Sequence, residues 1–307
     1  MKAFVILNPY ANRWQALKKK GEVEEELKKA DIEYDLVLTQ KPNQGTEMAA
    51  EAVKNGYNPI IAAGGDGTIN EVINGIILGA DVAGMELLPS LGIMPLGSAN
   101  DLVVNVHLPK DLKQAAQVIA AGNTRLMDLA IVNGKYFGNN SAIGLEPTIT
   151  LIQEKITRIR GTPRYLLATL LGIVKNPKWN MQLEWDNGKY NGLITLVTVG
   201  NNPLTGGLFY MTPHADPFDG ELTFVFGYMP TRLKILQLLP RTMKPGLGSY
   251  VENPSIHEIN STWLKIRSST PTPLHTDGEI QSMAVQEIEY RIIPRKIPVL
   301  LNYSSKI

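Results

Sequence analysis

The chain has 307 residues, a length typical of two globular domains, and its hydrophobic share of 44% is enough to build packed cores. Its 30 basic and 29 acidic residues leave a net charge of +1, which excludes the strongly positive field of a typical nucleic-acid-binding protein. The absence of cysteine excludes disulfides and cysteine-ligated zinc, and no run of 18 uninterrupted apolar residues predicts a membrane span. We expect a cytoplasmic protein with no nucleic-acid partner.

The first 128 residues alternate short apolar strands with helices. Predicted strands cover 3–7, 34–39, 60–63 and 91–94, and predicted helices cover 14–30 and 46–54. This order predicts a Rossmann-like, three-layer α/β/α domain whose parallel strands are covered by helices on both faces. Ligands of such sheets bind at the carboxyl ends of the strands, so we expect a binding site there.

The third predicted strand runs into the sequence GGDGT, residues 64–68, and apolar residues at helical spacing follow it. Three glycines in four positions let the backbone approach a ligand closely, and the N–H groups of a first helical turn favour an anion. Asp66 would repel a phosphate unless it holds a cation, a hydroxyl or a basic neighbour. The turn therefore indicates phosphoryl-transfer chemistry, although the chain contains no P-loop motif.

After about residue 128 the pattern changes to alternating apolar and polar residues, which is typical of antiparallel strands. The run 181–185 is followed by a glycine turn at 186–188, and the chain is expected to return over 193–199. Two helices are expected within this half, near 149–160 and 163–175.

We place the domain boundary at this change of pattern. The apolar segment 298–301 is expected to be a short strand that returns to the first domain. The prediction is a nucleotide-binding α/β domain over 1–128, completed by 295–307, and an antiparallel β-sandwich domain over 129–294 that binds the substrate.

Six motifs in order resemble the diacylglycerol kinase catalytic family, and in particular its bacterial soluble lipid kinases, which share their core with sphingosine and ceramide kinases. The motifs are NP at 8–9, GGDGT at 64–68, PLGSAND at 95–101, NGKYFGNNSAIG at 133–144, ADPFDGEL at 215–222 and HTDGE at 275–279. The ordered set is far more specific than GGDGT alone, which NAD kinases and phosphofructokinases carry in similar form. The resemblance covers nearly the whole chain.

The resemblance implies an ATP-dependent kinase that transfers the γ-phosphate of ATP to the hydroxyl of diacylglycerol or a related lipid, with Mg²⁺ and a carboxylate base. It also implies a set of ATP-binding residues, namely Asn8, Pro9, Thr39, Gly64, Gly65, Asp66, Gly67, Thr68, Asn70, Glu71, Gly97, Ser98 and Asn100. Ser98 stands where the family usually has threonine, and it keeps the hydroxyl. Asn12 stands where the family usually has glycine, and asparagine tolerates positive φ, so we expect the turn to be kept.

Carboxylates account for the remaining sites that the resemblance implies. Magnesium prefers oxygen ligands, and the family's metal site in the β domain corresponds to Asp216 and Asp219, with Glu221 contributing side chain or backbone. Asp101 and Asp128, which each follow a predicted strand, are expected to join Asp66 in a network linked by water and metal.

The nucleophile is a lipid hydroxyl, which needs a base at the moment of transfer. The family's base is an acidic residue of the DGE motif, and we favour Glu279, with Asp277 positioning it or contributing to the metal site. Asp66 completes the expected catalytic set. His275 is expected to be a strand residue rather than a catalyst.

Two alternatives stay open at this point: an NAD kinase-like enzyme and a nucleotide-binding protein without catalysis. The lipid is also open, because diacylglycerol, a sphingoid base, a glycolipid and phosphatidylglycerol all carry a suitable hydroxyl. An apolar cleft between the domains is expected to hold the lipid, and the apolar helices near 149–160 and 163–175 are candidates for its wall, with ordinary helix core as the alternative. We expect peripheral attachment at a membrane surface during turnover, and a homodimer remains open.

Overall fold

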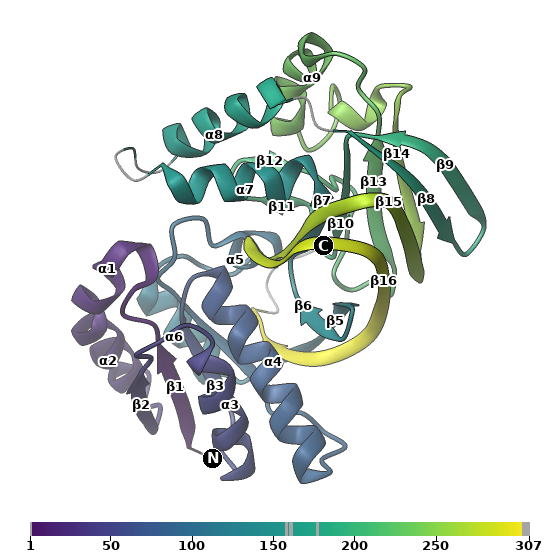
Figure 1. The fold of residues 1–307 in the computed structure, drawn as a ribbon. Coiled ribbons are helices and arrows are strands. Elements are labelled where there is room, and N and C mark those ends of the chain that lie inside the picture. Colours follow the sequence, from purple (N-terminus) through teal and green to yellow (C-terminus); the bar gives the residue numbers. More distant parts are fainter. Residues whose placement is uncertain (1, 157–158, 160–161, 176–177, 303–307) are drawn as a thin grey trace. The chain divides into compact units, whose positions relative to one another are not determined.

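The computed structural model describes residues 2–156, 159, 162–175 and 178–302 (Figure 1). Contacts within the chain divide it into two compact units, of which unit 1 comprises Met1–Leu129 and Pro294–Ile307, and unit 2 comprises Ala130–Ile293. Strands β5 (Thr124–Val132) and β16 (Glu279–Leu300) contribute residues to both units. Each unit has its own core and is described by itself.

Unit 1 is built on a parallel sheet in the order β2-β1-β3-β4. Its strands are β1 (Ala3–Leu7), β2 (Tyr34–Leu38), β3 (Ile60–Gly64) and β4 (Leu91–Pro95). Strands β3 and β4 are buried along their whole length, as expected where helices cover both faces of a parallel sheet. The end of β16 pairs with β4, with Val299 opposite Leu91, so the C-terminal segment joins this sheet.

Helices form the two outer layers of unit 1. On one face, α2 (Lys20–Lys29) and α6 (Leu112–Ala121) share an apolar core with the strands. Helices α3 (Gln44–Lys54) and α4 (Asp66–Ala83) pack tightly against each other. A Cβ on Gly75 of α4 would lie 2.5 Å from the Thr46 carbonyl oxygen, so this close approach requires glycine. The short helix α5 (Asp101–Asn105) follows β4.

The first helix predicted from the sequence, 14–30, is two helices in the structure. Helix α1 (Ala11–Lys18) and α2 meet at Lys19, and α1 begins irregularly. Asn12, Arg13 and Trp14 have φ values of 47°, 54° and 70°, which lie in the left-handed region. Asparagine tolerates the left-handed region better than most residues, which suits Asn12 to the first of these positions.

Unit 2 is an antiparallel β-sandwich with an inserted pair of helices. One run of strands has the order β14-β13-β10-β7-β15-β16, β8 pairs with β15 and β9, and β5 pairs with β6 and β16. The strands are β6 (Lys135–Phe137), β7 (Asn140–Gly144), β8 (Trp179–Trp185), β9 (Gly188–Ile194), β10 (Leu196–Gly200), β13 (Leu222–Gly227), β14 (Ile256–Ser261) and β15 (Trp263–Thr276), with the small sheet β11 (Leu204–Thr205) and β12 (Phe209–Tyr210). The long strand β15 pairs with β8 at its start and with β7 at its end, with register shifts between these parts. One strand thus has different neighbours along its length.

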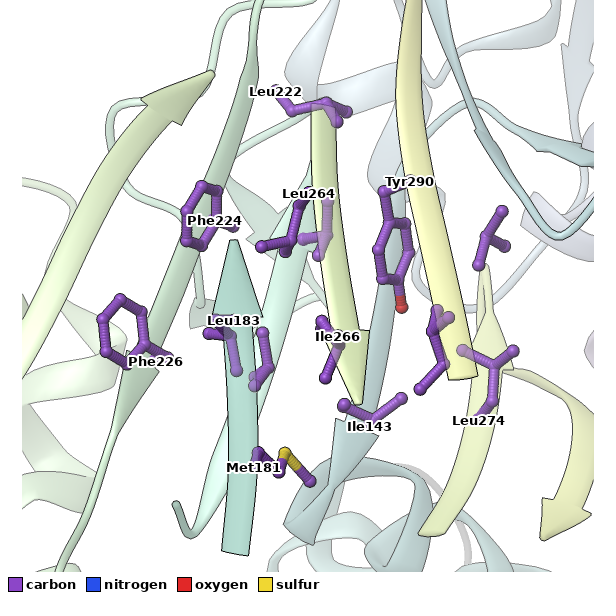
Figure 2. Close-up of a cluster of buried hydrophobic side chains, with 14 of the residues drawn as sticks. Ile143, Met181, Leu183, Leu222, Phe224, Phe226, Leu264, Ile266, Leu274 and Tyr290 are labelled. Carbon is purple, nitrogen blue, oxygen red and sulfur yellow. The ribbon is translucent and has the colours of Figure 1, made fainter. Parts of the chain in front are cut away.

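The sandwich core is filled by alternate residues of these strands. Figure 2 shows Leu183 of β8, Phe224 of β13, Leu264 and Ile266 of β15 and Tyr290 of β16 in one cluster, and all five are fully buried or nearly so. Alternate residues of a strand point to the same face, so the alternating pattern in the sequence marks this core directly. The ring of Phe224 also meets Trp185 edge-on, with the ring centroids 5.6 Å apart.

One strand boundary predicted for unit 2 is wrong. The sequence suggested a single return strand over 193–199, but β9 ends at Ile194 and β10 begins at Leu196. Thr195 lies between them, its N–H donates to the Gly227 carbonyl, and its own carbonyl accepts the Leu145 N–H. The chain therefore leaves the pairing with β8 at Thr195 and joins β13 and β7 instead.

The helices of unit 2 are α7 (Leu145–Lys155), α8 (Thr162–Lys175) and α9 (Arg232–Leu238), followed by the 3₁₀ turns η1 (Leu239–Met243) and η2 (Tyr250–Glu252). Helix α7 begins four residues before its predicted start, and the end of its predicted range lies beyond the described residues. Of the helices in the described ranges, none has the length and apolar character needed to cross a membrane.

Candidate functional site

The GGDGT turn of unit 1 joins β3 to α4, as the sequence predicted, and its glycines are required by protein packing. A Cβ on Gly64 would lie 2.3 Å from the Thr68 hydroxyl oxygen. A Cβ on Gly97 would lie 2.5 Å from the Cα of Gly65, so the two glycine turns lie backbone against backbone. The close approach that the sequence assigned to a ligand is thus made first between the turns after β3 and β4. Gly67 follows within the first turn of α4.

The loops after β1 and β2 lie next to the first turn of α4. The Asn8 side-chain amide donates to the Thr68 hydroxyl oxygen over 3.1 Å, and Pro9, which follows it, is buried. The Thr39 N–H donates to the Leu7 carbonyl, which holds the end of β2 beside β1. The structure therefore brings Asn8, Thr39 and the GGDGT turn to the carboxyl ends of neighbouring strands, which is the edge at which α/β sheets bind ligands.

Asp66 is the first residue of α4, and its carboxylate stabilises another loop. Its Oδ1 accepts the backbone N–H of Leu102 at 3.1 Å, near the start of α5. Burial raises the pKa of Asp66, and N–H groups of Leu102 and its neighbours oppose this shift in part. Asp66 is half-buried and bonded within the protein, so its turn is more constrained than the sequence alone indicated.

The PLGSAND segment closes on itself through an asparagine. The Asn100 side chain accepts from the Gly97 N–H at 2.9 Å and donates to the Gly97 carbonyl at 3.2 Å, while Asn100 itself has a φ of 55°. The Ser98 hydroxyl donates to the Asn12 side-chain oxygen over 2.8 Å. The left-handed start of α1 thus contacts the PLGSAND segment.

Glu71 has a role that the sequence did not reveal. Its two carboxylate oxygens accept the backbone N–H groups of Asn43 and Gly45, at 2.9 Å and 2.8 Å, and so cap the start of α3. Asn70, one residue earlier, is buried and accepts from the Asn74 side chain. Contact of either residue with a nucleotide stays a prediction. No local pattern could have indicated the cap, because Glu71 and α3 are brought together only by helix packing.

Asp101 and Asp128 are both buried in unit 1. Asp101 begins α5, and Asp128 lies on β5, where its Oδ1 accepts the Arg295 N–H at 2.6 Å. Arg295 has a φ of 52°, so this bond holds the chain at an irregular point of β16. The network linking these residues to Asp66 stays a prediction.

The DGE motif of unit 2 forms a tight hairpin between β15 and β16. Thr276 pairs with Glu279 across the loop, and the two loop residues Asp277 and Gly278 have φ values of 47° and 80°. Positive φ at both positions is typical of the type I′ turn, for which Asp-Gly is a favoured sequence. The turn chemistry alone therefore explains the aspartate and glycine of this motif.

The two acids of this hairpin differ in their surroundings. The Asp277 carboxylate accepts three backbone N–H groups, from Gly138, Asn139 and Asn140, at 3.2, 3.0 and 2.9 Å. Glu279, by contrast, is an exposed side chain at the first position of β16. Asp277 thus fixes the hairpin to the loop before β7, whereas the carboxylate of Glu279 is accessible from solvent.

Another acid, Glu146, is buried in unit 2. It accepts from the Asn140 amide at 3.1 Å and from the Thr198 hydroxyl at 2.8 Å, and its Oε1 lies 3.3 Å from Nε2 of the buried His275. The His275 contact is close enough for an ion pair but lacks hydrogen-bond geometry. His275 is therefore a buried strand residue facing an acid that sequence reasoning missed. The order of the residues gave no signal, because α7 brings Glu146 to β15.

Asp216 and Asp219 lie exposed in the loop before β13. The Oδ1 of Asp216 accepts the Phe218 N–H at 3.0 Å, and the Oδ1 of Asp219 accepts the N–H of Glu221 at 2.8 Å. Within the described parts of the chain, no three acidic or histidine side chains gather as a ready-made metal site. Magnesium needs only one or two protein carboxylates with water, so this donor set suits it.

Comparison with known proteins identifies the family. Residues 2–132 match the diacylglycerol kinase catalytic domain, and residues 139–301, more than half of the chain, match the YegS C-terminal NAD kinase beta sandwich-like domain. The chain belongs to the diacylglycerol kinase-like lipid kinase family. It is a kinase enzyme, and the predicted fold class, an α/β domain followed by an antiparallel β-sandwich, is confirmed.

The similarity of this lipid kinase to its relatives extends along nearly the whole of both chains. Curated diacylglycerol kinases of Staphylococcus saprophyticus and Staphylococcus haemolyticus are each 28% identical, over 91% and 90% of this chain and 88% and 82% of theirs. A crystal structure of a diacylglycerol kinase from Bacillus anthracis has a TM-score of 0.78 at 23% identity, covering 99% of this chain and 98% of that one. A yeast NADH kinase structure shares the fold more distantly, with a TM-score of 0.51 at 12% identity, covering 99% of this chain and 84% of that one.

The lipid kinase also has an apolar pocket within unit 2. Helices α7, α8 and α9 and strands β10 and β13 surround it, and its lining includes Ile149, Ile173, Met229, Ile235 and Leu238. Glu146 also belongs to the lining. The pocket lies within unit 2, so a lipid-binding cleft between the domains, walled by these helices, stays a prediction.

Proposed function

We propose that this lipid kinase transfers the γ-phosphate of ATP to the hydroxyl of diacylglycerol at a membrane surface. The names of the curated relatives support diacylglycerol as the substrate, because they match along about nine-tenths of this chain. The observation that carries the proposal is the arrangement at the carboxyl ends of β3 and β4. There, two glycine turns lie in contact, and the turn after β3 leads into the start of the 18-residue helix α4.

The nucleotide half of the reaction is assigned to unit 1. The first N–H groups of α4 have no partner within the helix, and Gly65, at the N-cap, provides no side chain to satisfy them. Such a helix start attracts phosphate oxygens through these N–H groups and through the helix dipole. Asn8 and Thr68, which are hydrogen-bonded to each other, and the loop at Gly97 and Ser98 would line the bound nucleotide.

The proton-transfer half is assigned to Glu279. The lipid hydroxyl loses its proton to the Glu279 carboxylate, its oxygen bonds to the γ-phosphorus, and the bond to the β-phosphate oxygen breaks to release ADP. Exposure supports Glu279 over Asp277, because the Asp277 carboxylate accepts three backbone N–H groups. Asp277 would therefore act by positioning the hairpin that carries Glu279.

Asp216 and Asp219 would hold Mg²⁺, with Glu221 beside them. When bound, this ion neutralises charge on the phosphate oxygens. The apolar pocket beneath α7 and α8 supports a lipid rather than a soluble acceptor, since its lining beyond Glu146 is largely aliphatic.

Radiolabelled ATP transfer tests the proposal. Purified protein would be incubated with labelled ATP, Mg²⁺ and dispersions of diacylglycerol, ceramide, sphingosine, phosphatidylglycerol or a glycolipid, with NAD as a separate acceptor. We expect label in phosphatidic acid, lost when EDTA removes the metal. Label in another lipid would correct the substrate, and label in NAD alone would overturn the proposal.

A further inference from the structure

Helix α8 carries an apolar stripe on its exposed side. Leu170, Leu171 and Val174 are 44%, 44% and 56% exposed, and with the half-buried Leu167 they follow the i, i+3, i+4, i+7 spacing of one helix face. The opposite side, with Ala168 and Ile173, is buried in unit 2. Helix α8 is therefore apolar on both sides, and within the described part of the chain one of these sides stays exposed to solvent.

A second exposed apolar surface lies on the segment after β13. Leu233 and Leu236 of α9 are 64% and 38% exposed, and Leu247, in the loop after η1, is 96% exposed. Helices α8 and α9 contact each other, as Figure 1 also shows. The loop with Leu247 is held by Arg241, whose guanidinium donates to the carbonyls of Gly248 and Ser249. We call the exposed side of α8, α9 and this loop the docking face.

The charges around the docking face are predominantly basic, and the acid nearest the Leu247 loop, Glu252, forms an ion pair with Arg241 at 3.0 Å. The segments 162–178 and 228–249 contain seven basic residues and no acidic residue, although the whole chain has 30 basic and 29 acidic residues. The basic residues are Arg164, Lys175, Lys178, Arg232, Lys234, Arg241 and Lys244. Exposed leucines next to lysines and arginines are typical of surfaces that lie in the headgroup region of an anionic bilayer.

The end of α4 offers a contrast within the same chain. Leu78, Val82 and Leu87 are 50%, 63% and 84% exposed, so apolar exposure there is at least as large. The acids near them in the sequence are Asp81 and Glu86. Residues 55–109 contain no lysine or arginine. Among the basic residues of the neighbouring helix α3, Lys54, at its end, lies closest to this region, and the region lacks the excess of basic residues found at the docking face.

We propose that the docking face binds the surface of an anionic bilayer and thereby brings unit 2 to its lipid. This rests on the proposed function for the identity of the lipid, but its physical basis is the combination of exposed apolar side chains with an excess of basic residues. The leucines enter the boundary between headgroups and acyl chains, and the lysines stay among the headgroups. The apolar pocket lies beneath the same helices, lined by Thr169 and Ile173 of α8 and Ile235 of α9.

The test compares two matched helix pairs in the full-length protein. Leu170→Gln with Val174→Gln changes the docking face, and Leu78→Gln with Val82→Gln is the control at the same i, i+4 spacing and similar exposure. Co-sedimentation with vesicles of phosphatidylglycerol and phosphatidylcholine should show about tenfold weaker binding for the first pair and no change for the control. A second comparison, Leu247→Gln against Leu87→Gln, avoids helices altogether and should give the same ordering.

Salt and a soluble substrate complete the test. Wild-type binding should fall as salt rises and should be weak on phosphatidylcholine alone, because the basic residues attract anionic lipid. Phosphorylation of monomeric dioctanoylglycerol should be unchanged in the Leu170 and Val174 variant, while phosphorylation of vesicle-embedded diacylglycerol falls. Loss of both activities together would place these residues in the fold or the active site and overturn the docking face.

The remaining outcomes separate the two proposals. Equal vesicle binding by both helix pairs would overturn the docking face, even if diacylglycerol is phosphorylated. If no lipid is phosphorylated but the binding difference holds, the docking face stands and the proposed function fails. If light scattering shows that the Leu170 and Val174 variant loses a dimer while its vesicle binding is unchanged, the face is an interface between copies and the proposal is overturned.

Discussion

The two acidic turns of this lipid kinase are built in different ways. In unit 1, the GGDGT turn packs its glycines against the loop after β4, and Asp66 accepts the Leu102 N–H. In unit 2, the DGE turn is a two-residue hairpin in which Asp277 accepts three N–H groups and Glu279 is exposed.

The comparison shows that the acidic residues of these motifs differ in their structural roles. Asp66 and Asp277 both satisfy backbone N–H groups that would otherwise lack a partner, and each connects its turn to a loop far away in the sequence. Glu279 alone among these three is exposed. We therefore expect Glu279 to affect turnover with little effect on stability, and Asp277 to affect stability first.

The largest expected effect is that of Glu279→Gln on turnover. Glutamine keeps the shape but cannot accept the lipid proton, and a positioned base contributes about 10²–10⁴-fold to the rate. The melting temperature and the ATP dissociation constant should stay close to those of the wild type, because the side chain is exposed. Assays of kcat with diacylglycerol and calorimetry with ATP give both readings. Normal turnover would remove Glu279 from the role of base.

Asp277→Asn should destabilise unit 2. The amide oxygen can still accept one or two of the N–H groups of 138–140, but its NH₂ group then faces a donor, and the charge of the acceptor is lost. Hydrogen bonds to charged groups are worth about 1.5–3 kcal/mol, so we expect a loss of about 2 kcal/mol in the free energy of unfolding. Denaturant unfolding measures it. A fully stable variant with lost turnover would instead make Asp277 part of the chemistry.

Gly97→Ala tests whether the paired glycine turns of unit 1 are required by packing. The new Cβ would lie 2.5 Å from the Gly65 Cα, and a backbone atom cannot move aside cheaply, so we expect a loss of about 1–3 kcal/mol in unfolding free energy. Gly21→Ala is the control, because its Cβ meets no atom within 4 Å and alanine favours the helix. Equal stability of the two variants would contradict the packing requirement.

The smallest expected effect concerns pH and Asp66. Burial raises the pKa of Asp66, so the folded state binds a proton more tightly than the unfolded chain. Stability from this group is therefore lost as the pH rises from the ordinary aspartate value of about 3.9 through the raised pKa, by at most about 1.4 kcal/mol per pH unit. Asp66→Asn keeps the acceptor for Leu102 and removes the titration.

The measurement for Asp66 is the melting temperature of wild type and variant at pH 4 and pH 7. We expect the melting temperature of the variant, relative to that of the wild type, to be higher at pH 7 than at pH 4. A higher relative melting temperature of the variant at pH 4 would mean that the N–H groups around Asp66, rather than its burial, dominate the shift of its pKa.

Local elements and turn types could be read from the sequence. The observed bounds of β1 are those predicted, β3 and β4 each extend one residue further than predicted, and the glycine turn after β8 lies where the sequence placed it. These features depend on burial alternation and turn chemistry over a few residues. The division of the first helix at Lys19 was missed. The switch at Thr195 was missed because it depends on pairing with the distant strands β7 and β13.

The sequence by itself determined the order of strands, helices and motifs and the family to which they belong. The tertiary structure alone decided which groups those motif residues contact: Gly97 lies against Gly65, Glu71 caps α3, Glu146 faces His275, and Asp277 binds the loop before β7. A local pattern specifies which face of an element is buried, but it does not specify which distant backbone N–H group lacks a partner. Long-range packing brings that group to a particular carboxylate, and so it separates the acids that hold the fold from the acid left exposed.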